Sequence, residues 1–249
     1  MERNLIITLM LLIAGTHQVK AQSDDFGMWY ELGVEKKLTN KLNVGVEAEF
    51  RTRNNSRTAD RLAFGVNVDY KLLKFLKASG GYTFLYDNFQ EELDMKSDGL
   101  TPNKWTPSYW APRHRFNVSL TGSVNWKRLG ISLRERWQYT YRPEATGKKY
   151  DIDNDEWDSK KGKGKNVLRS RLQLTYDIPH WKFDPFANVE MFTAKGGTQK
   201  MRYQIGIDYK LKKKHNFSLT YRYQDVRSND DDNEANRHLI GIGYTYKFK

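Results

Sequence analysis

The side chains of this chain that could do chemistry are mostly arginines and carboxylates placed two residues apart. Arg134 and Arg136 form one such pair, and Arg169 and Arg171 form another. Residues i and i+2 of a β-strand lie on the same face, so each pair would present two guanidinium groups to one side of a sheet. Guanidinium groups gathered in this way either pair with carboxylates or line a path for anions.

Carboxylates that could neutralise these arginines occur in other segments. Glu47 and Glu49 are two residues apart, and Glu190 lies much later in the chain. We predict one charge network, whose members are Arg134, Arg136, Arg169, Arg171, Arg202, Glu47, Glu49 and Glu190. If these groups are buried and fully paired, loss of one carboxylate should be costly.

Catalysis would need a nucleophile within reach of a base. His114, His238 and Ser170 could supply these groups, but no histidine has serine two residues on, which is the arrangement typical of barrel lipases. Histidines at a membrane interface are more often without a chemical role. We therefore predict no enzymatic activity and no catalytic residue, with a membrane-embedded lipid hydrolase or acyltransferase as the less favoured alternative.

The composition excludes several other classes. The 249 residues contain no cysteine, which removes disulfides, zinc knuckles and thiol nucleophiles. No metal-ligand spacing and no glycine-rich phosphate loop is present, so we predict no metal and no cofactor. An aromatic share of 14% argues against disorder. The formal net charge of +12 comes from basic residues that alternate with apolar ones and are offset by acids, which disfavours nucleic-acid binding.

Period-two alternation predicts the elements that position the charged residues. In Leu62–Leu72 every second residue is apolar, and the same pattern recurs in Met201–Leu211. An amphipathic helix would need a different period. We predict eleven strands: 28–38, 42–53, 61–72, 76–87, 113–126, 129–142, 167–178, 183–192, 201–211, 216–224 and 237–248. Many are long enough to cross a bilayer at a tilt, which takes about ten residues.

The two faces of these strands differ sharply. With the phase that we assign, the outer face carries only Lys36 and Glu135 as charged residues, besides His114 and His238. We attribute Glu135 to a β-bulge or a rephased strand rather than to catalysis. A soluble sandwich or a lipocalin-like barrel would expose the charged face and would need strands of about half this length. The pattern instead favours an antiparallel transmembrane β-barrel of about ten to twelve strands, with a charged lumen.

The connections alternate between short and long. The predicted short links are 39–41, 73–75, 127–128, 179–182 and 212–215, and the predicted long links are 54–60, 88–112, 143–166, 193–200 and 225–236. Outer-membrane barrels have short periplasmic turns and longer extracellular loops, and aromatic girdles near the strand ends. Eleven strands is an odd number, although bacterial single-chain barrels are even. The segment 88–112 could therefore hide a twelfth strand, or 28–38 could fail to cross.

The first residues predict export. Arg3 precedes the apolar stretch Leu5–Ala14, and Val19-Lys20-Ala21 ends in a small-residue cleavage site. We therefore predict a signal peptide over 1–21 and a mature barrel over 22–249. Without the signal peptide the net charge is +11.

Short motifs spread through the chain resemble a known family. The resemblance rests on Trp29, Arg51, Leu133-Arg134-Glu135-Arg136-Trp137, Arg169-Ser170-Arg171, Asn188–Phe192, Arg202 with Gly206, and Tyr221-Arg222-Tyr223-Gln224. Together they are similar to the outer-membrane β-barrel family of Bacteroidota classed as domain of unknown function 2490. The resemblance implies a place in the cell outer membrane, in contact with its lipid, and implies no activity.

The C-terminal strand also resembles the signal that the barrel assembly machinery reads. Gly243, Tyr246 and Phe248 carry this similarity, and Lys249 departs from it by following the final aromatic residue. We expect an outer-membrane barrel with a narrow lumen or one filled by side chains. A small anion-preferring channel is the alternative.

Overall fold

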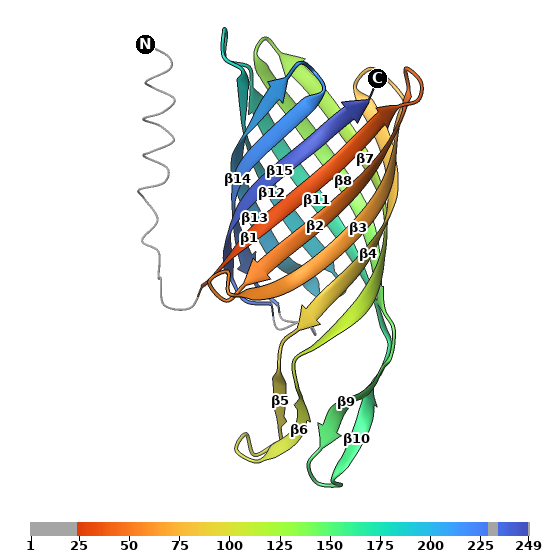
Figure 1. Ribbon diagram of the computed structural model, residues 1–249, viewed down its shortest axis with the longest axis vertical. Helices are drawn as coiled ribbons and strands as arrows, with labels where there is room; N and C mark the ends of the chain where they lie inside the picture. The colour runs from red at the N-terminus through yellow and green to blue at the C-terminus, as the bar shows by residue number, and fades with distance from the viewer. Residues whose placement is uncertain (1–23, 229–233, 249) are drawn as a thin grey trace.

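The computed structural model describes residues 24–228 and 234–248 (Figure 1). The predicted signal peptide over 1–21 lies outside these residues. Strands make up almost all of the regular structure. The staves of the barrel are β1 (Asp25–Lys37), β2 (Leu42–Arg53), β3 (Thr58–Lys71), β4 (Leu76–Phe89), β7 (Tyr109–Trp126), β8 (Leu129–Arg142), β11 (Lys163–Tyr176), β12 (Phe183–Ala194), β13 (Gly197–Leu211), β14 (His215–Val226) and β15 (Arg237–Phe248).

These eleven staves close into one barrel, in the order β1-β15-β14-β13-β12-β11-β8-β7-β4-β3-β2. Each stave is antiparallel to the next one along the chain, but β1 and β15 pair in parallel, with Asp25 opposite Arg237 and Lys36 opposite Phe248. An odd number of alternating staves makes the first and the last run in the same direction, so the closing pair has to be parallel. The prediction of a wholly antiparallel barrel was therefore wrong, and the odd count needs no hidden stave.

The connections at the end of the barrel where β15 ends, which is the upper end in Figure 1, have two to six residues each. They span residues 38–41, 72–75, 127–128, 177–182 and 212–214. Lys127, Lys212 and Lys213 adopt positive φ angles of 53°, 52° and 58°, which allow the chain to reverse within two or three residues. The prediction that these five turns are short is confirmed. The predicted alternation was wrong at the opposite end, where only 54–57 joins β2 to β3 and only 195–196 joins β12 to β13, because these staves extend further than predicted.

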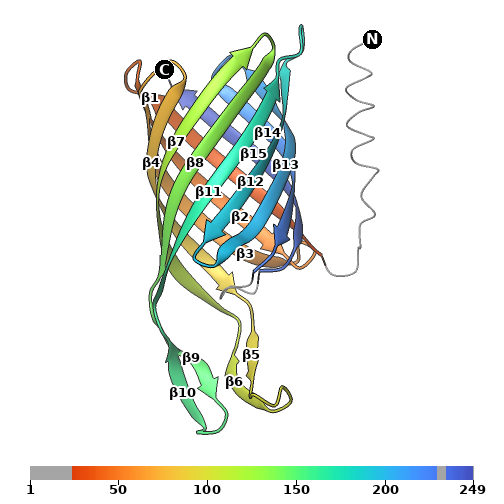
Figure 2. The ribbon, with the colours of Figure 1, turned by 180° about the vertical axis from the view of Figure 1, so that it is seen from behind.

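The two longest connections form a small sheet outside the barrel. Segment 88–112 contains β5 (Glu92–Met95) and β6 (Pro102–Thr106), and segment 143–166 contains β9 (Ala145–Asp151) and β10 (Glu156–Lys160). The four strands pair in the order β10-β9-β6-β5, and together they extend from the end of the barrel opposite to the short turns (Figures 1 and 2). The sequence predicts loops for both segments, with a hidden stave in 88–112 as the alternative, so the external sheet differs from both predictions.

An aromatic cluster stabilises this external sheet. Trp157 on β10, Tyr150 on β9 and Trp105 on β6 lie opposite one another in register. The ring centroid of Trp157 lies 5.2 Å from that of Tyr150 and 6.1 Å from that of Trp105. The cluster gives a sheet of very short strands an apolar contact of its own.

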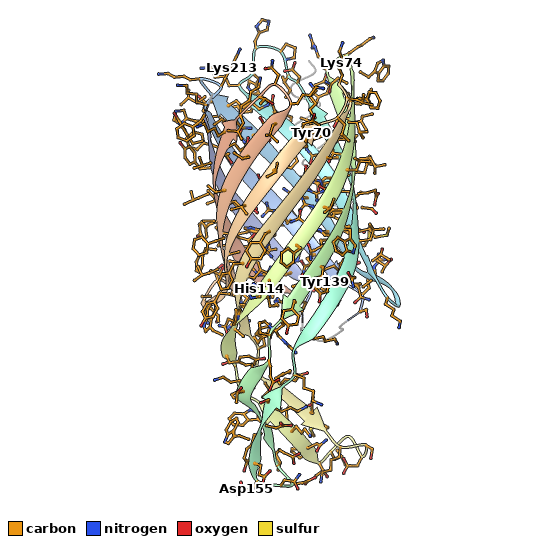
Figure 3. All side chains as sticks on the ribbon, turned by 90° about the vertical axis from the view of Figure 1, so that its right-hand side faces the viewer. Tyr70, Lys74, His114, Tyr139, Asp155 and Lys213 are labelled. Carbon is orange, nitrogen blue, oxygen red and sulfur yellow. The ribbon has the colours of Figure 1, made fainter. Side chains whose placement is uncertain are left out.

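The barrel is apolar outside and charged inside. Phe64 and Val66 on β3 are 61% and 54% exposed on the outer face, whereas Asn67 between Val66 and Val68 points inward. Rings such as Tyr70 at one end and His114 and Tyr139 towards the other point away from the barrel wall (Figure 3). Within the described residues, no helix has the length and apolarity needed to span a membrane.

Candidate functional site

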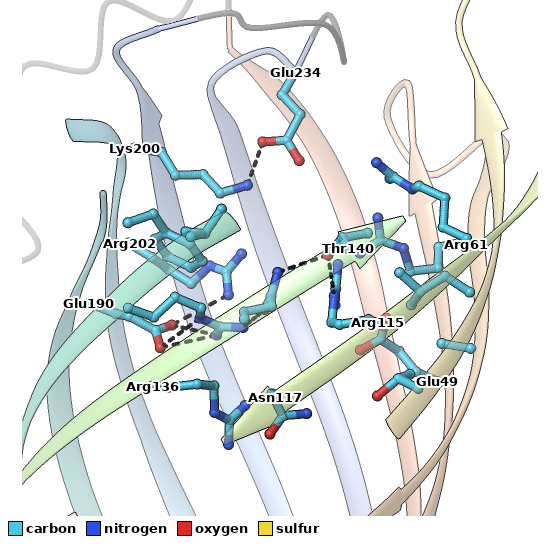
Figure 4. A pocket seen from close by; sticks show the side chains of 18 of the residues that line it. Glu49, Arg61, Arg115, Asn117, Arg136, Thr140, Glu190, Lys200, Arg202 and Glu234 are labelled. Carbon is cyan, nitrogen blue, oxygen red and sulfur yellow. Dashed lines mark hydrogen bonds and ion pairs between the residues drawn. The ribbon is translucent and has the colours of Figure 1, made fainter. Parts of the chain in front are cut away.

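The barrel encloses a cavity of about 330 Å³ in the half that lies nearer to the long connections. We call it the lumen cavity. Its described lining contains fourteen basic and five acidic side chains, which are Arg51, Arg61, Arg113, Arg115, Arg134, Arg136, Arg142, Lys163, Lys165, Arg169, Arg171, Lys200, Arg202 and Arg222, with Glu31, Glu47, Glu49, Glu190 and Glu234. Figure 4 shows several of these side chains converging from opposite walls.

Glu190 on β12 is the centre of the largest ion-pair group in the cavity. Its side chain is only 3% exposed. The Oε1 atom accepts a hydrogen bond from Arg134 Nη2 at 2.5 Å, and Oε2 accepts one from Arg169 Nη2 at 3.0 Å. Arg202 Nη1 lies 3.7 Å from Oε2. One carboxylate thus contacts guanidinium groups from three other strands, β8, β11 and β13 (Figure 4).

The register explains how these groups meet. Arg136 lies opposite Arg169, and Arg134 lies opposite Arg171, because β8 and β11 pair in an antiparallel hairpin. Arg171 lies opposite Glu190 on the other side of β11, and Glu190 lies opposite Arg202 on β13. Two-residue spacing within each strand keeps all of these side chains on the inner face.

The other predicted members of the network behave differently. Arg136 and Arg171 line the cavity, but within the described chain neither makes a hydrogen bond, an ion pair or a ring contact. Glu49 pairs with Arg51, with 2.7 Å between Glu49 Oε1 and Arg51 Nε, rather than with the β8 and β11 arginines. Glu47 also lines the cavity and has no ion-pair partner among the described residues. The structure therefore joins Glu190 to three arginines and leaves the four remaining members outside this group.

Two ion-pair groups near the long connections lay outside the predicted network. The Asp87 carboxylate contacts both Arg61 and Arg113. Asp60 Oδ1 lies 3.2 Å from Arg53 Nη1, and Asp60 Oδ2 lies 3.0 Å from Arg237 Nη1. The alternation of the sequence does predict that Asp87 faces inward, as Arg61 and Arg113 do. Asp87 is the last residue of a predicted strand, however, and at a strand end the alternation predicts the direction of a side chain less well.

Trp29 lies inside the barrel, a position that the sequence analysis did not predict for it. It is 6% exposed and lines the lumen cavity. The Cζ atoms of Arg51 and Arg222 lie 3.3 and 4.0 Å from its ring centroid, within the range of cation–π contacts. Arg222 also pairs with Glu31 at 3.0 Å between Nη2 and Oε2.

Gly241 on β15 leaves space for this contact. A Cβ atom there would lie 2.2 Å from Thr220 Oγ1 and 2.8 Å from Arg222 Nη1. The absence of a side chain at residue 241 therefore allows Arg222 to reach Trp29.

The side chains considered for catalysis do not form a Ser–His pair within the described chain. Ser170 donates a hydrogen bond to Glu135 Oε2 at 2.6 Å. His114 Nδ1 lies 2.8 Å from the Tyr82 hydroxyl, and His238 Nδ1 lies 2.7 Å from the Tyr221 hydroxyl. Each histidine is thus held by a tyrosine of a neighbouring strand on the outer face.

Glu135 does face outward, without a bulge. The pairing of β8 with β7 and with β11 is continuous past Glu135, which lies opposite Leu120 and Ser170. Our explanation through a bulge or a rephased strand was therefore wrong. The hydrogen bond from Ser170 provides this outward carboxylate with a donor instead.

Fold and site together define a closed β-barrel with an apolar exterior and a strongly basic interior. The chain belongs to the family described as "Protein of unknown function (DUF2490)", whose model matches residues 26–236. No curated protein sequence matches the chain.

Two solved structures are similar to this barrel. One is the β domain of the Bordetella autotransporter BrkA, with a TM-score of 0.49 and 12% identity over 82% of this chain and 78% of that one. The other is the NanC porin, with a TM-score of 0.49 and 16% identity over 90% of this chain and 99% of that one.

Proposed function

We propose that this protein is an outer-membrane β-barrel whose narrow lumen passes small anions in preference to cations. The membrane assignment is supported by staves of twelve or more residues and by an outer face that is almost free of charge. Charged side chains on the inner face would be unusual for a soluble barrel, whose core is apolar.

The two longest connections support an orientation. They extend from the end opposite to the one where β15 ends, and we propose that this end, with the external sheet of β5, β6, β9 and β10, faces the outside of the cell, since outer-membrane barrels have their longer loops there. Tyr246 and Phe248 lie at the end of β15 with ring centroids 4.6 Å apart. We propose that they, with Gly243, present the strand that the barrel assembly machinery recognises.

The observation that carries the anion preference is the charge of the lumen cavity. Fourteen basic and five acidic side chains line it, so its described lining has a large positive excess. Low-dielectric walls strengthen the field of such an excess, which attracts anions and repels cations. Rings of arginine and lysine select anions in other pores by the same principle.

The number of staves and the small residues at one end support passage through the lumen. About eight staves give an interior that side chains just fill, and the diameter grows with the number of staves. Here the inner face nearer to the short turns carries small residues, such as Gly33, Gly45, Ser132, Ser218 and Gly243. A second cavity, of about 410 Å³, lies at that end.

We expect planar bilayers that contain the purified mature protein to show stable conductance under a KCl gradient. The sign of the reversal potential should show that chloride is more permeant than potassium. Arg115→Gln removes a lumen guanidinium whose described hydrogen bond is to Thr140 at 3.4 Å, and should lower the chloride preference. Lys149→Gln removes a cation of the external sheet and should leave the preference unchanged. Negligible conductance, or a preference for potassium, would refute the channel and favour the closed, ion-paired interior.

We further propose that the protein is not an enzyme. Ser170 and the two outer-face histidines are hydrogen-bonded to other side chains and lie in separate places. A phospholipase assay on the reconstituted protein tests this, and turnover lost in Ser170→Ala would contradict it.

The location can be tested separately. We expect the mature chain to begin at Gln22 and to fractionate with outer membranes. Recovery of a soluble periplasmic monomer without detergent would contradict the membrane assignment.

A further inference from the structure

Arg136 on β8 and Arg171 on β11 are placed together on one wall of the lumen cavity. They are diagonal neighbours, because Arg136 lies opposite Arg169 while Arg171 lies opposite Arg134. Both strands are paired continuously here, so the two guanidinium groups are held on rigid elements. Figure 4 shows Arg136 projecting into the cavity below the group around Glu190.

These two arginines have no partner in the part of the chain that the structure describes. The Nε atoms of both are buried without an acceptor. Other lumen arginines are matched: Arg51 pairs with Glu49, and Arg222 pairs with Glu31.

Glu190, the nearest carboxylate in the register, does not neutralise Arg136 and Arg171 in addition to its own partners. Glu190 already contacts Arg134, Arg169 and Arg202. With Arg136 and Arg171 included, five guanidinium groups share one carboxylate. Glu47 is close enough to Arg136 to interact electrostatically, but the two form no ion pair.

A neutral donor lies on the stave next to Arg171. Asn188 on β12 is 9% exposed, and its Nδ2 atom is buried without an acceptor. It is opposite Gln173, one inward position from Arg171, which is opposite Glu190. Asn188 does not line the lumen cavity, so the donors available to a ligand there are those of Arg136 and Arg171 themselves. Their positive charge and their unused donors are what an oxyanion requires.

We propose that Arg136 and Arg171 form a binding site for a doubly charged oxyanion of the phosphate type. Leaving buried cations unmatched is costly, and an anion or water has to compensate them. The planar fork of arginine fits phosphate and carboxylate oxygens bidentately, and two such forks match two negative charges. A cavity of about 330 Å³ holds on the order of eleven water molecules, enough for a phosphate with part of its hydration.

This inference deepens the proposed function, since it assumes that the lumen cavity is reachable from solution. The phosphate group could be inorganic phosphate or a monoester on a small sugar. Both present the same dianionic head, so binding of either depends on the same two arginines.

Calorimetric titration of the detergent-solubilised mature protein with inorganic phosphate, glucose 6-phosphate and chloride tests the site. We expect phosphate to bind more tightly than chloride. Arg136→Gln and Arg171→Gln should each weaken it about tenfold or more, since a hydrogen bond to a charged group contributes about 1.5–3 kcal/mol. Arg227→Gln, which removes an exposed loop arginine paired with Asp225, is the control and should leave the affinity unchanged. Tighter binding of the ester than of inorganic phosphate would identify a phosphorylated solute, and the opposite order would identify the free ion.

Folding and conductance separate the remaining outcomes. Both variants remove repulsion and should fold with unchanged or higher stability in a urea titration. The double variant combines Arg136→Gln with Arg171→Gln. If the protein conducts anions but the double variant binds phosphate as tightly as the wild type, the proposed site is refuted and the proposed channel is not. Phosphate binding lost in the double variant of a protein that does not conduct would support the site and overturn the channel.

Discussion

Replacement of Glu190 by glutamine is expected to lower the free energy of unfolding by about 3–5 kcal/mol, because it removes the shared counter-charge of a buried ion-pair group. The Glu190 carboxylate contacts Arg134, Arg169 and Arg202 and is only 3% exposed. Glutamine keeps the size and one acceptor oxygen but has no charge. The three guanidinium groups would then repel one another without compensation, beside Arg136 and Arg171.

Urea titration of the protein folded into lipid vesicles measures this effect. Glu47→Gln is a matched control, since Glu47 lines the same cavity without an ion pair, and it should change the unfolding free energy by much less. An unchanged midpoint for Glu190→Gln would show that water rather than Glu190 compensates these arginines. That result would contradict the network, whether or not the lumen conducts.

The alternation of apolar and polar residues predicted the strands and their faces well. In β8 and β11 it also predicted that Arg134, Arg136, Arg169 and Arg171 belong to one charge network, and the pairing of the two strands sets the two arginine pairs side by side. A period of two leaves only two choices of face for each strand, and sharp contrast between the faces decides between them.

The closure of the barrel and the external sheet could not be predicted in the same way. Parallel pairing of β1 with β15 joins the two ends of the chain, and no local pattern reports such a contact. The strands of the external sheet have four to seven residues, and β6 and β9 pair only at Lys104 with Asp151 and Trp105 with Tyr150. Strands this short contain too few alternations to stand out from a loop.

The choice of ion-pair partner was likewise only partly predictable. Glu47, Glu49 and Glu190 all face the lumen, but only Glu190 pairs with Arg134 and Arg169. Glu190 is opposite Arg171 in the register, whereas Glu49 has Arg51 two residues away on its own strand. Distance across the lumen depends on the curvature of the closed barrel, which the sequence does not contain.

The same closure gives Trp29 its place. Trp29 on β1, Arg51 on β2 and Arg222 on β14 come from widely separated parts of the chain, and their contacts exist only because β1 lies between β2 and β15. An aromatic ring among guanidinium groups provides attraction without consuming a negative charge. The lumen thus holds several arginines close together while keeping its positive excess.

The second large effect expected concerns the assignment of the two faces of β3. Val66 lies mid-strand, with 54% of its surface exposed on the outer face, and the adjacent Asn67 points into the barrel. Val66→Arg should lower the free energy of unfolding by about 2–4 kcal/mol if the residue lies near the bilayer midplane, because hydrocarbon cannot solvate the guanidinium group.

Asn67→Arg is the matched control for Val66→Arg, since it introduces the same side chain one residue further along the same strand. It should be milder, because the lumen already accommodates many charged groups and the inner face around it is polar. Folding of both variants into vesicles, followed by urea titration, compares the two directly. A larger loss for Asn67→Arg than for Val66→Arg would mean that the apolar face of β3 does not contact lipid, and the membrane-spanning barrel would then be untenable, since every other stave is phased by the same rule.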